Sequence, residues 1–141
     1  MTVAEALKNW LYTFENIELD DRINTDKLDS EPESYGLFKQ ANQEVVTFVN
    51  GTRDITDYFT FLARQSTKAE SSRLDNAEWM EALERWVYKK NLAGELPTLD
   101  NGRICNRVAV TVGGYMLENE NLETAQYQLS ILINYTEVNN A

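Results

Sequence analysis

The chain has 141 residues, a formal net charge of −10 and a hydrophobic content of 43%, which together predict one packed domain over residues 1–141. With no histidine and a single cysteine, it has no imidazole for a catalytic triad and cannot form an internal disulfide, and the usual zinc, haem and iron–sulfur sites are close to excluded. The acidic balance disfavours tight binding to nucleic-acid phosphates. No apolar run is long enough to predict a membrane span, and no signal-peptide pattern opens the chain, so we expect an intracellular protein.

The first predicted element is a helix over about residues 3–16. Thr2 followed by Glu5 is a capping-box pattern, which is typical of a helix N-terminus. Apolar residues then recur at helical spacing, and such a stripe favours packing against a sheet. The stripe consists of Val3, Leu7, Trp10, Leu11 and Phe14.

An acidic stretch from Glu18 to Ser34 follows, with Pro32 inside it. It predicts an exposed loop, with room for a short strand at about residues 17–22. Its carboxylates are dense enough to raise the question of calcium. The spacing does not match an EF-hand loop, which needs a central glycine and a terminal bidentate glutamate, so no metal site is predicted.

Three strands are predicted next, over residues 35–38, 45–49 and 55–65. Asn50-Gly51 stands between the last two and is the dipeptide that best tolerates the positive φ angles of a tight hairpin turn. The third strand has apolar side chains on both faces. This pattern indicates a central strand, or one whose outer face a neighbouring subunit covers.

A second helix is predicted over about residues 73–92, capped by Asp75 or Asn76, with Gly94 as its stop signal. Its apolar side chains recur at helical spacing and predict a second face packed on the sheet. They are Trp79, Leu83, Trp86 and Val87, joined by Met80 and Leu92.

The two segments nearest the C-terminus alternate between apolar and polar residues, which is typical of half-buried strands. In the last one, the predicted buried face carries Tyr127, Leu129, Ile131, Ile133 and Tyr135. Leu132 is the one apolar residue on its other face. In the upstream strand, which begins at Arg103, the predicted apolar face carries Ile104, Val108, Val110 and Val112.

The fold predicted from these elements is α+β: an antiparallel β-sheet with two helices packed on one face, in the order α-β-β-β-α-β-β. No repeat or linker divides the chain.

No catalytic, cofactor-binding or metal-binding residues are predicted. Gly113-Gly114 lacks the lysine and helix start of a phosphate loop and predicts a bend or bulge. Cys105 lies within a predicted strand, where a half-buried inert thiol is the expectation. Two glycosylation sequons, at Asn50 and Asn134, are explained by their turn and strand positions.

Four arginines are better candidates for function, because guanidinium groups on strand faces can pair with the carboxylates of a neighbouring molecule. Pairing within the chain is the equally weighted alternative. These residues are Arg53, Arg64, Arg103 and Arg107.

Several segments carry a resemblance to a known group of proteins. They include Ala4-Glu5-Ala6-Leu7, Tyr35-Gly36-Leu37-Phe38, Ile55-Thr56-Asp57-Tyr58 and Asp100-Asn101-Gly102-Arg103, with the closing Gln126-Tyr127-Gln128-Leu129-Ser130. In these segments, and in their order over nearly the whole length, the chain resembles the minor-capsid and tail-terminator-like proteins of long-tailed bacteriophages and prophages. None of the segments is a catalytic signature, so the resemblance implies no active site.

The resemblance implies a structural virion protein, not an enzyme. Tail-terminator-like proteins form a six-membered ring that caps the tail tube and joins it to the head connector. The implied partners are therefore other copies of the chain, the tail tube protein and the head-connector or neck proteins. DNA would pass through the ring without specific binding, no membrane would be involved, and the protein would be assembled in the host cytoplasm into the virion tail or neck. The alternative is an intracellular, non-enzymatic α+β binding or adaptor module, expected to be a monomer with a discrete apolar pocket or groove.

Overall fold

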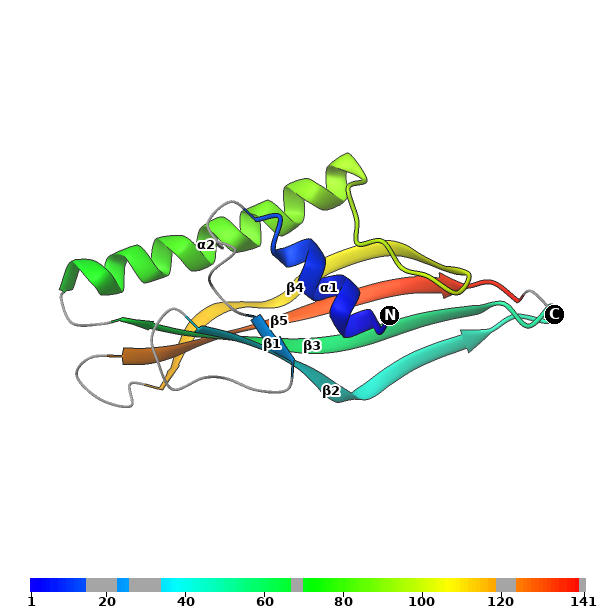
Figure 1. Ribbon diagram of the computed structural model, residues 1–141, viewed down its shortest axis with the longest axis horizontal. Coiled ribbons are helices and arrows are strands. Elements are labelled where there is room, and N and C mark those ends of the chain that lie inside the picture. The colour runs from blue at the N-terminus through cyan, green and yellow to red at the C-terminus, as the bar shows by residue number, and fades with distance from the viewer. Residues whose placement is uncertain (15–22, 26–33, 67–69, 119–123, 140–141) are drawn as a thin grey trace.

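The computed structural model describes residues 1–14, 23–25, 34–66, 70–118 and 124–139. Two helices lie on the same face of a five-stranded sheet, so the α+β architecture is confirmed (Figure 1). In chain order the elements are α1 (Val3–Leu11), β1 (Ile23–Thr25), β2 (Ser34–Thr47), β3 (Arg53–Ser66), α2 (Glu70–Ala93), β4 (Arg103–Glu118) and β5 (Thr124–Glu137).

The sheet has the strand order β1-β2-β3-β5-β4. Its four long strands are antiparallel, as predicted, whereas the short β1 runs parallel to β2. β3 lies between β2 and β5, which confirms its prediction as a central strand. The predicted element order is met, but the strands differ. Residues 35–38 and 45–49 were expected as two strands, and the structure has one, β2, with a register shift between Lys39 and Gln43.

The predicted acidic loop is described only in part. Residues 23–25, expected within that loop, form the edge strand β1. The rest of the acidic stretch up to residue 33, and the short strand predicted at 17–22, lie outside the described residues.

α1 begins as predicted and ends earlier. The hydroxyl of Thr2 accepts a 3.0 Å hydrogen bond from the backbone N–H of Glu5, so the N-cap is confirmed. The helix ends at Leu11, not near residue 16, because the Thr13 hydroxyl donates a 2.6 Å bond to the Trp10 carbonyl in the last turn. A hydroxyl that bonds a nearby carbonyl competes with helix propagation.

α2 packs one face on the sheet and on α1. Met80, Leu83 and Val87 are buried there, and the ring of Trp86 lies 4.6 Å from that of Trp10 between centroids. Leu92 was expected on this face, and that prediction is wrong, because its side chain is 72% exposed.

The start of α2 also differs from the prediction. The helix begins at Glu70, so the predicted caps Asp75 and Asn76 lie inside it. Asn76 is buried, and its amide lies 3.4 Å from the hydroxyl of Tyr127 in the core. In the sequence, this buried and hydrogen-bonded asparagine therefore looks like a helix N-cap.

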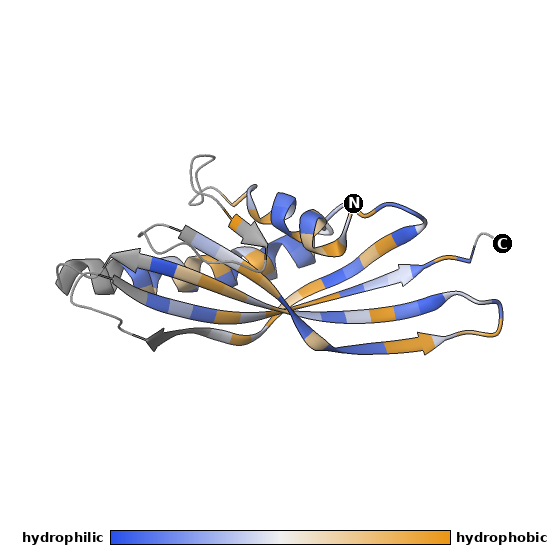
Figure 2. Ribbon diagram, turned by 60° about the horizontal axis from the view of Figure 1, so that its bottom comes forward, coloured by the Kyte–Doolittle hydropathy of each residue, from blue (hydrophilic) through white to orange (hydrophobic). Residues whose placement is uncertain are grey.

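β5 confirms its predicted alternation. All five predicted side chains, from Tyr127 to Tyr135, are buried on the face covered by the helices. The alternating colours along the strands in Figure 2 show the same period of two. Leu132, on the opposite face, is also nearly buried although no helix covers that face.

β4 does not keep one apolar face, because bulges interrupt it. Cys105 pairs with Tyr135 and Arg107 pairs with Asn134, so one extra residue of β4 is accommodated between them. A one-residue bulge moves the following side chains to the other face. Ile104 consequently lies on the helix-free face, opposite to Val108, and is 60% exposed. Further register shifts place Val112 on that helix-free face and confirm a bulge at Gly113-Gly114.

The predicted hairpin turn is confirmed. The backbone N–H of Phe48 donates to the Thr52 carbonyl at 2.8 Å, and Gly51 has φ +88°. Gly94 also ends α2 as predicted, with φ +72°. A second tight turn joins Asp100 to Arg103, with both central residues at positive φ.

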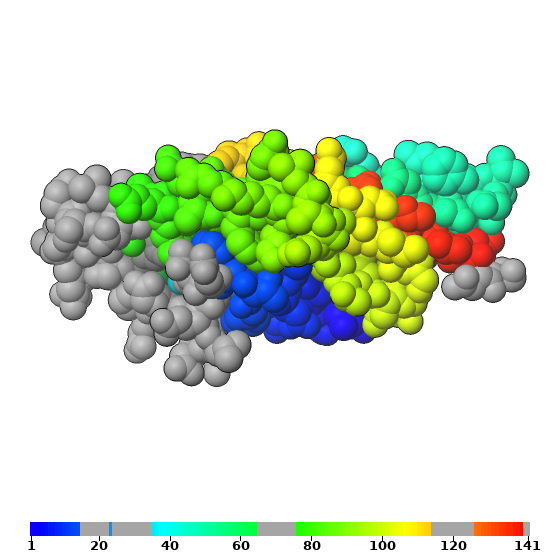
Figure 3. Space-filling view, turned by 90° about the horizontal axis from the view of Figure 1, so that it is seen from above, coloured from blue at the N-terminus to red at the C-terminus, as the bar shows by residue number. Residues whose placement is uncertain are grey.

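One end of the sheet extends past the helices. Figures 1 and 3 show the β2–β3 hairpin and the C-terminal end of β5 reaching beyond α1 and α2. We call this end, together with the part of the sheet at its base, the arm and define it as residues 43–57, 103–108 and 133–137. It contains four paired strand segments.

Candidate interaction surfaces

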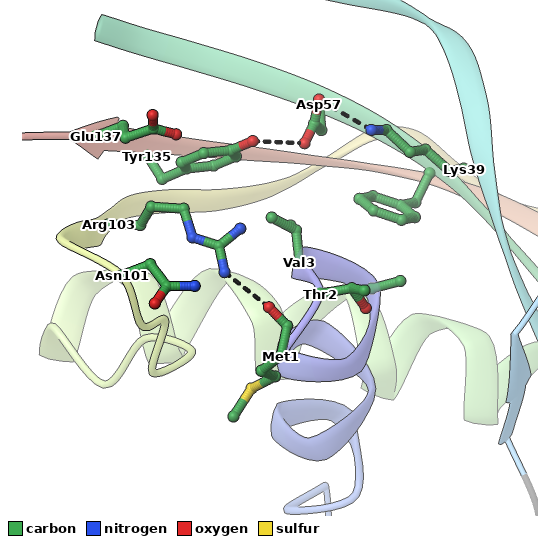
Figure 4. Close-up of a pocket in the computed structure, with 11 residues that line it drawn as sticks. Met1, Thr2, Val3, Lys39, Asp57, Asn101, Arg103, Tyr135 and Glu137 are labelled. Atoms are coloured by element: carbon green, nitrogen blue, oxygen red, sulfur yellow. Dashed lines mark hydrogen bonds and ion pairs between the residues drawn. The ribbon is translucent and has the colours of Figure 1, made fainter. Parts of the chain in front are cut away.

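A polar pocket of about 610 Å³ lies at the base of the arm, between the start of α1, the 100–103 turn and the helix-side face of β3 and β5 (Figure 4). Its deepest charged group is the fully buried carboxylate of Asp57. Figure 4 shows Lys39 and Tyr135 directed at this carboxylate from the two neighbouring strands.

The Asp57 carboxylate is well satisfied. Its Oδ2 accepts a 2.9 Å bond from the hydroxyl of Tyr135, and its Oδ1 accepts a 2.6 Å bond from the Gln43 amide. The Nζ of Lys39 lies 3.9 Å from Oδ1. A buried carboxylate needs such partners, since an unpaired buried charge is strongly destabilising. The network fixes β2 to β3 at the point where β2 shifts register.

The network is suited to structure rather than to proton transfer. Burial, together with the bond to the Asp57 carboxylate, raises the pKa of Tyr135 well above its usual value. The phenol is therefore neutral at physiological pH and acts as a hydrogen-bond donor. The sequence analysis missed Asp57. It lies two positions from Ile55 and from Phe59, so it shares their face of β3, and a polar residue on an otherwise apolar strand face is the signal for a buried hydrogen-bond network.

Cys105 lies on the helix-side face of β4. Burial raises the pKa of its thiol to about 11. A thiol with this pKa is almost fully protonated at neutral pH, so it is a poor nucleophile.

The four candidate arginines are not brought together. Arg53 pairs with Glu137 at 2.9 Å, and Arg103 bonds Asp100 at 2.6 Å. These two therefore follow the alternative of pairing within the chain. Arg64 is buried and also engaged. Arg107 differs, because it is exposed at the β4 edge and forms no ion pair with the described residues.

A groove of about 490 Å³ lies between α2 and β4. Val87 and Tyr88 of α2 form one wall, and Val108 to Val110 of β4 form the other. Asn91 crosses it: its side-chain oxygen accepts a 2.8 Å bond from the Val108 N–H, and its amide donates to the Val108 carbonyl. Asn91 thus satisfies the β4 edge at that residue as a neighbouring strand would.

The two edges of the arm remain open elsewhere. Within the described residues, β2 pairs only with β3 beyond Leu37, and β4 pairs only with β5. Every residue of β2 from 41 to 47 is exposed. Open strand edges present unpaired N–H and C=O groups to which another strand can add.

Apolar side chains are concentrated on this arm. Figure 2 shows apolar bands reaching its end. They are far more exposed than the core, and exposed apolar patches mark interaction sites. Those on the arm and its turn are Val45, Val46, Phe48, Val49 and Ile104, with Val138 just after β5.

Among the described residues, no group of three or more cysteine, aspartate or glutamate side chains is arranged to hold a metal ion. Neither α1 nor α2, the helices of the described ranges, is long and apolar enough to cross a membrane.

No protein-family model matches the chain, and no curated protein matches it.

Proposed function

We propose that the protein is a structural subunit of the tail end or neck of a long-tailed bacteriophage, where copies form a ring that terminates the tail tube and joins it to the head connector. The proposal starts from the resemblance of its segments to tail-terminator-like proteins. The observation that carries it is the arm, whose two open edges belong to different strands. Such edges suit a head-to-tail contact between copies, and head-to-tail contacts that close generate rings.

The helix-free face of the arm supports passage of DNA without binding. Its charged side chains among the described residues are two carboxylates, Glu44 and Asp54, and the guanidinium of Arg107. Threonine and asparagine side chains lie between these charged groups on the central strands. Tight binding to phosphates needs several clustered cations, which this face does not present within the described part of the chain.

A second candidate function is the non-enzymatic binding or adaptor module. The α2–β4 groove favours it, because an apolar groove with a few polar groups is the usual form of a ligand site. Tyr88 and Arg107, which also line the groove, would supply those polar groups. An adaptor would work as a monomer and would leave the arm edges open.

Deleting the gene from the phage or prophage that encodes it, followed by negative-stain microscopy of the lysate, tests the proposal. Overlong tails or tails without heads support a terminator. Full heads beside unattached tails of normal length support a joining role. Normal, infectious particles would overturn the structural proposal and leave the adaptor module.

A further inference from the structure

The residues at the two edges of the arm belong to the same rows of directly paired residues across the four strands. We call each such row a rung. Glu44 of β2 pairs with Thr56 of β3, which pairs with Asn134 of β5, which pairs with Arg107 of β4. Each rung therefore ends in one β2 residue and one β4 residue. The side chains of Glu44 and Arg107 both lie on the helix-free face.

Another rung ends in two apolar side chains on this same face. It runs from Val46 through Asp54 and Thr136 to Ile104. Val46 is 55% exposed and Ile104 is 60% exposed. On this rung the charged and polar residues lie in the centre, and the apolar residues lie at the two open edges. An isolated sheet favours the opposite arrangement, because its edges are in contact with solvent.

The directions of the strands fit continuation of the sheet from copy to copy. β2, β3, β5 and β4 are antiparallel in succession, so β2 and β4 run in opposite directions. If the β4 edge of one subunit meets the β2 edge of the next, the new pair is antiparallel as well. The sheet then continues with its helices on the same side.

We propose that the partner of each arm edge is a second copy of this chain: residues 44–47 of one subunit add to residues 103–107 of the next as an antiparallel strand, rung to rung. This places Glu44 beside Arg107 and Val46 against Ile104 across the interface. The inference rests on the proposed function, because it supplies the subunit contact that a ring requires.

Charge complementarity identifies the occupant as a copy of the chain. Among the described residues, Arg107 is exposed and has no ion pair, and Glu44 is exposed and accepts a 2.9 Å bond from the Tyr58 hydroxyl. Within one subunit three strand spacings of about 4.8 Å separate the backbones of these two residues, and no ion pair joins their side chains. Across the proposed interface they become direct cross-strand neighbours, where opposite charges are favourable.

Asn91 sets the limit of the interface. Its side chain already occupies the backbone N–H and C=O of Val108, so an added strand cannot continue past that residue without displacing it. The pairing is confined to the outer part of the arm, where β4 carries its bulge between Cys105 and Arg107. A bulge reduces non-specific edge pairing and so restricts which strand can be added.

Engineered cysteines test the interface. Two variants are made in a Cys105→Ser background and carry different tags: one has Val46→Cys and the other has Ile104→Cys. They are produced together in cells in which the deletion phage is growing, and the cysteines are then oxidised. Paired strands bring Cα atoms within disulfide range. We expect disulfide-linked dimers that contain both tags, and none when either cysteine variant is produced alone. No linkage in the mixture, or linkage of Ile104→Cys chains to each other, would overturn the proposal.

Charge reversal gives an independent readout. Glu44→Arg and Arg107→Glu should each lower the plaque count of the complemented deletion phage at least tenfold, and the double variant should restore it. Lys89→Glu on the exposed side of α2 is the matched control and should leave it unchanged. Single variants that complement fully would contradict the interface. If deletion disturbs the tails but the cysteines do not link, the proposed function stands and the proposed interface is wrong. If the cysteines link but the deletion phage makes normal particles, the interface stands and the proposed function is wrong.

Discussion

Tyr135 and Asp57 lie diagonally across β5 and β3, and the tyrosine hydroxyl donates a 2.9 Å hydrogen bond to the aspartate within the core. Both residues lie at the base of the arm, where they line the pocket beside the start of α1. Asp57 therefore stabilises the arm although a carboxylate is unfavourable at a buried position, because Tyr135, Gln43 and Lys39 present donors to it.

Removing this bond should destabilise the protein. Tyr135→Phe leaves Asp57 with one partner fewer in a buried site, so we expect the free energy of unfolding to fall by about 1–3 kcal/mol. Urea denaturation followed by circular dichroism measures it. Tyr58→Phe is the matched control: it removes the bond to Glu44 on the exposed face, and its effect should stay within about 0.5 kcal/mol. Equal effects of the two substitutions would show that burial of the Asp57 network is not what stabilises the arm.

The same tyrosine predicts a pH dependence. Its pKa is raised in the folded protein above the unfolded value of about 10. The unfolded chain therefore loses this proton first, so the contribution to stability is full below about pH 10 and declines as the pH rises above it. We expect the stability gap between the natural chain and Tyr135→Phe to narrow above pH 10. A gap that stays constant from pH 8 to 11 would contradict the raised pKa.

Two leucines of α2 test the corrected helix face. Leu83 is fully buried under the sheet, whereas Leu92 lies on the opposite side in solvent. Leu83→Ala should cost about 2–5 kcal/mol, because it removes core contacts and leaves a cavity. Leu92→Ala should change stability by less than about 0.5 kcal/mol. A large loss from Leu92→Ala in thermal or urea unfolding would place that side chain in an interface.

The edge bond of Asn91 gives a further prediction. Asn91→Ala leaves the N–H and C=O of Val108 without their partner, and we expect a loss of about 1–3 kcal/mol. Hydrogen exchange at Val108 should also become faster in this variant. Unchanged exchange would mean that another group protects the β4 edge.

Regular elements were predictable from the sequence, and irregular ones were not. The alternation from Tyr127 to Tyr135 predicted β5 correctly, because that strand has no bulge. In β4 the same rule failed at Ile104, because a one-residue bulge reverses the faces and leaves no clear mark in the pattern. Leu92 failed for a different reason: its apolar side chain suggested the buried face, although its position lies half a turn around the helix from Leu83, on the solvent side.

The interaction surfaces depend on relations that the sequence does not contain. The sequence singled out Arg107, but its lack of an ion pair among the described residues and its rung shared with Glu44 follow only from the strand pairing. Arg53 and Arg103 look the same as Arg107 in the sequence. Tertiary pairing with Glu137 and Asp100 separates them from it.

Assembly of the purified chain tests whether its copies form a ring at the end of the tail. Its mass is measured by light scattering and its shape by negative-stain microscopy, first alone and then after mixing with tails isolated from the deletion phage. We expect closed rings of the chain, free in solution or at the ends of the tails. A chain that stays monomeric at high concentration and leaves the tail ends bare would contradict the proposed ring.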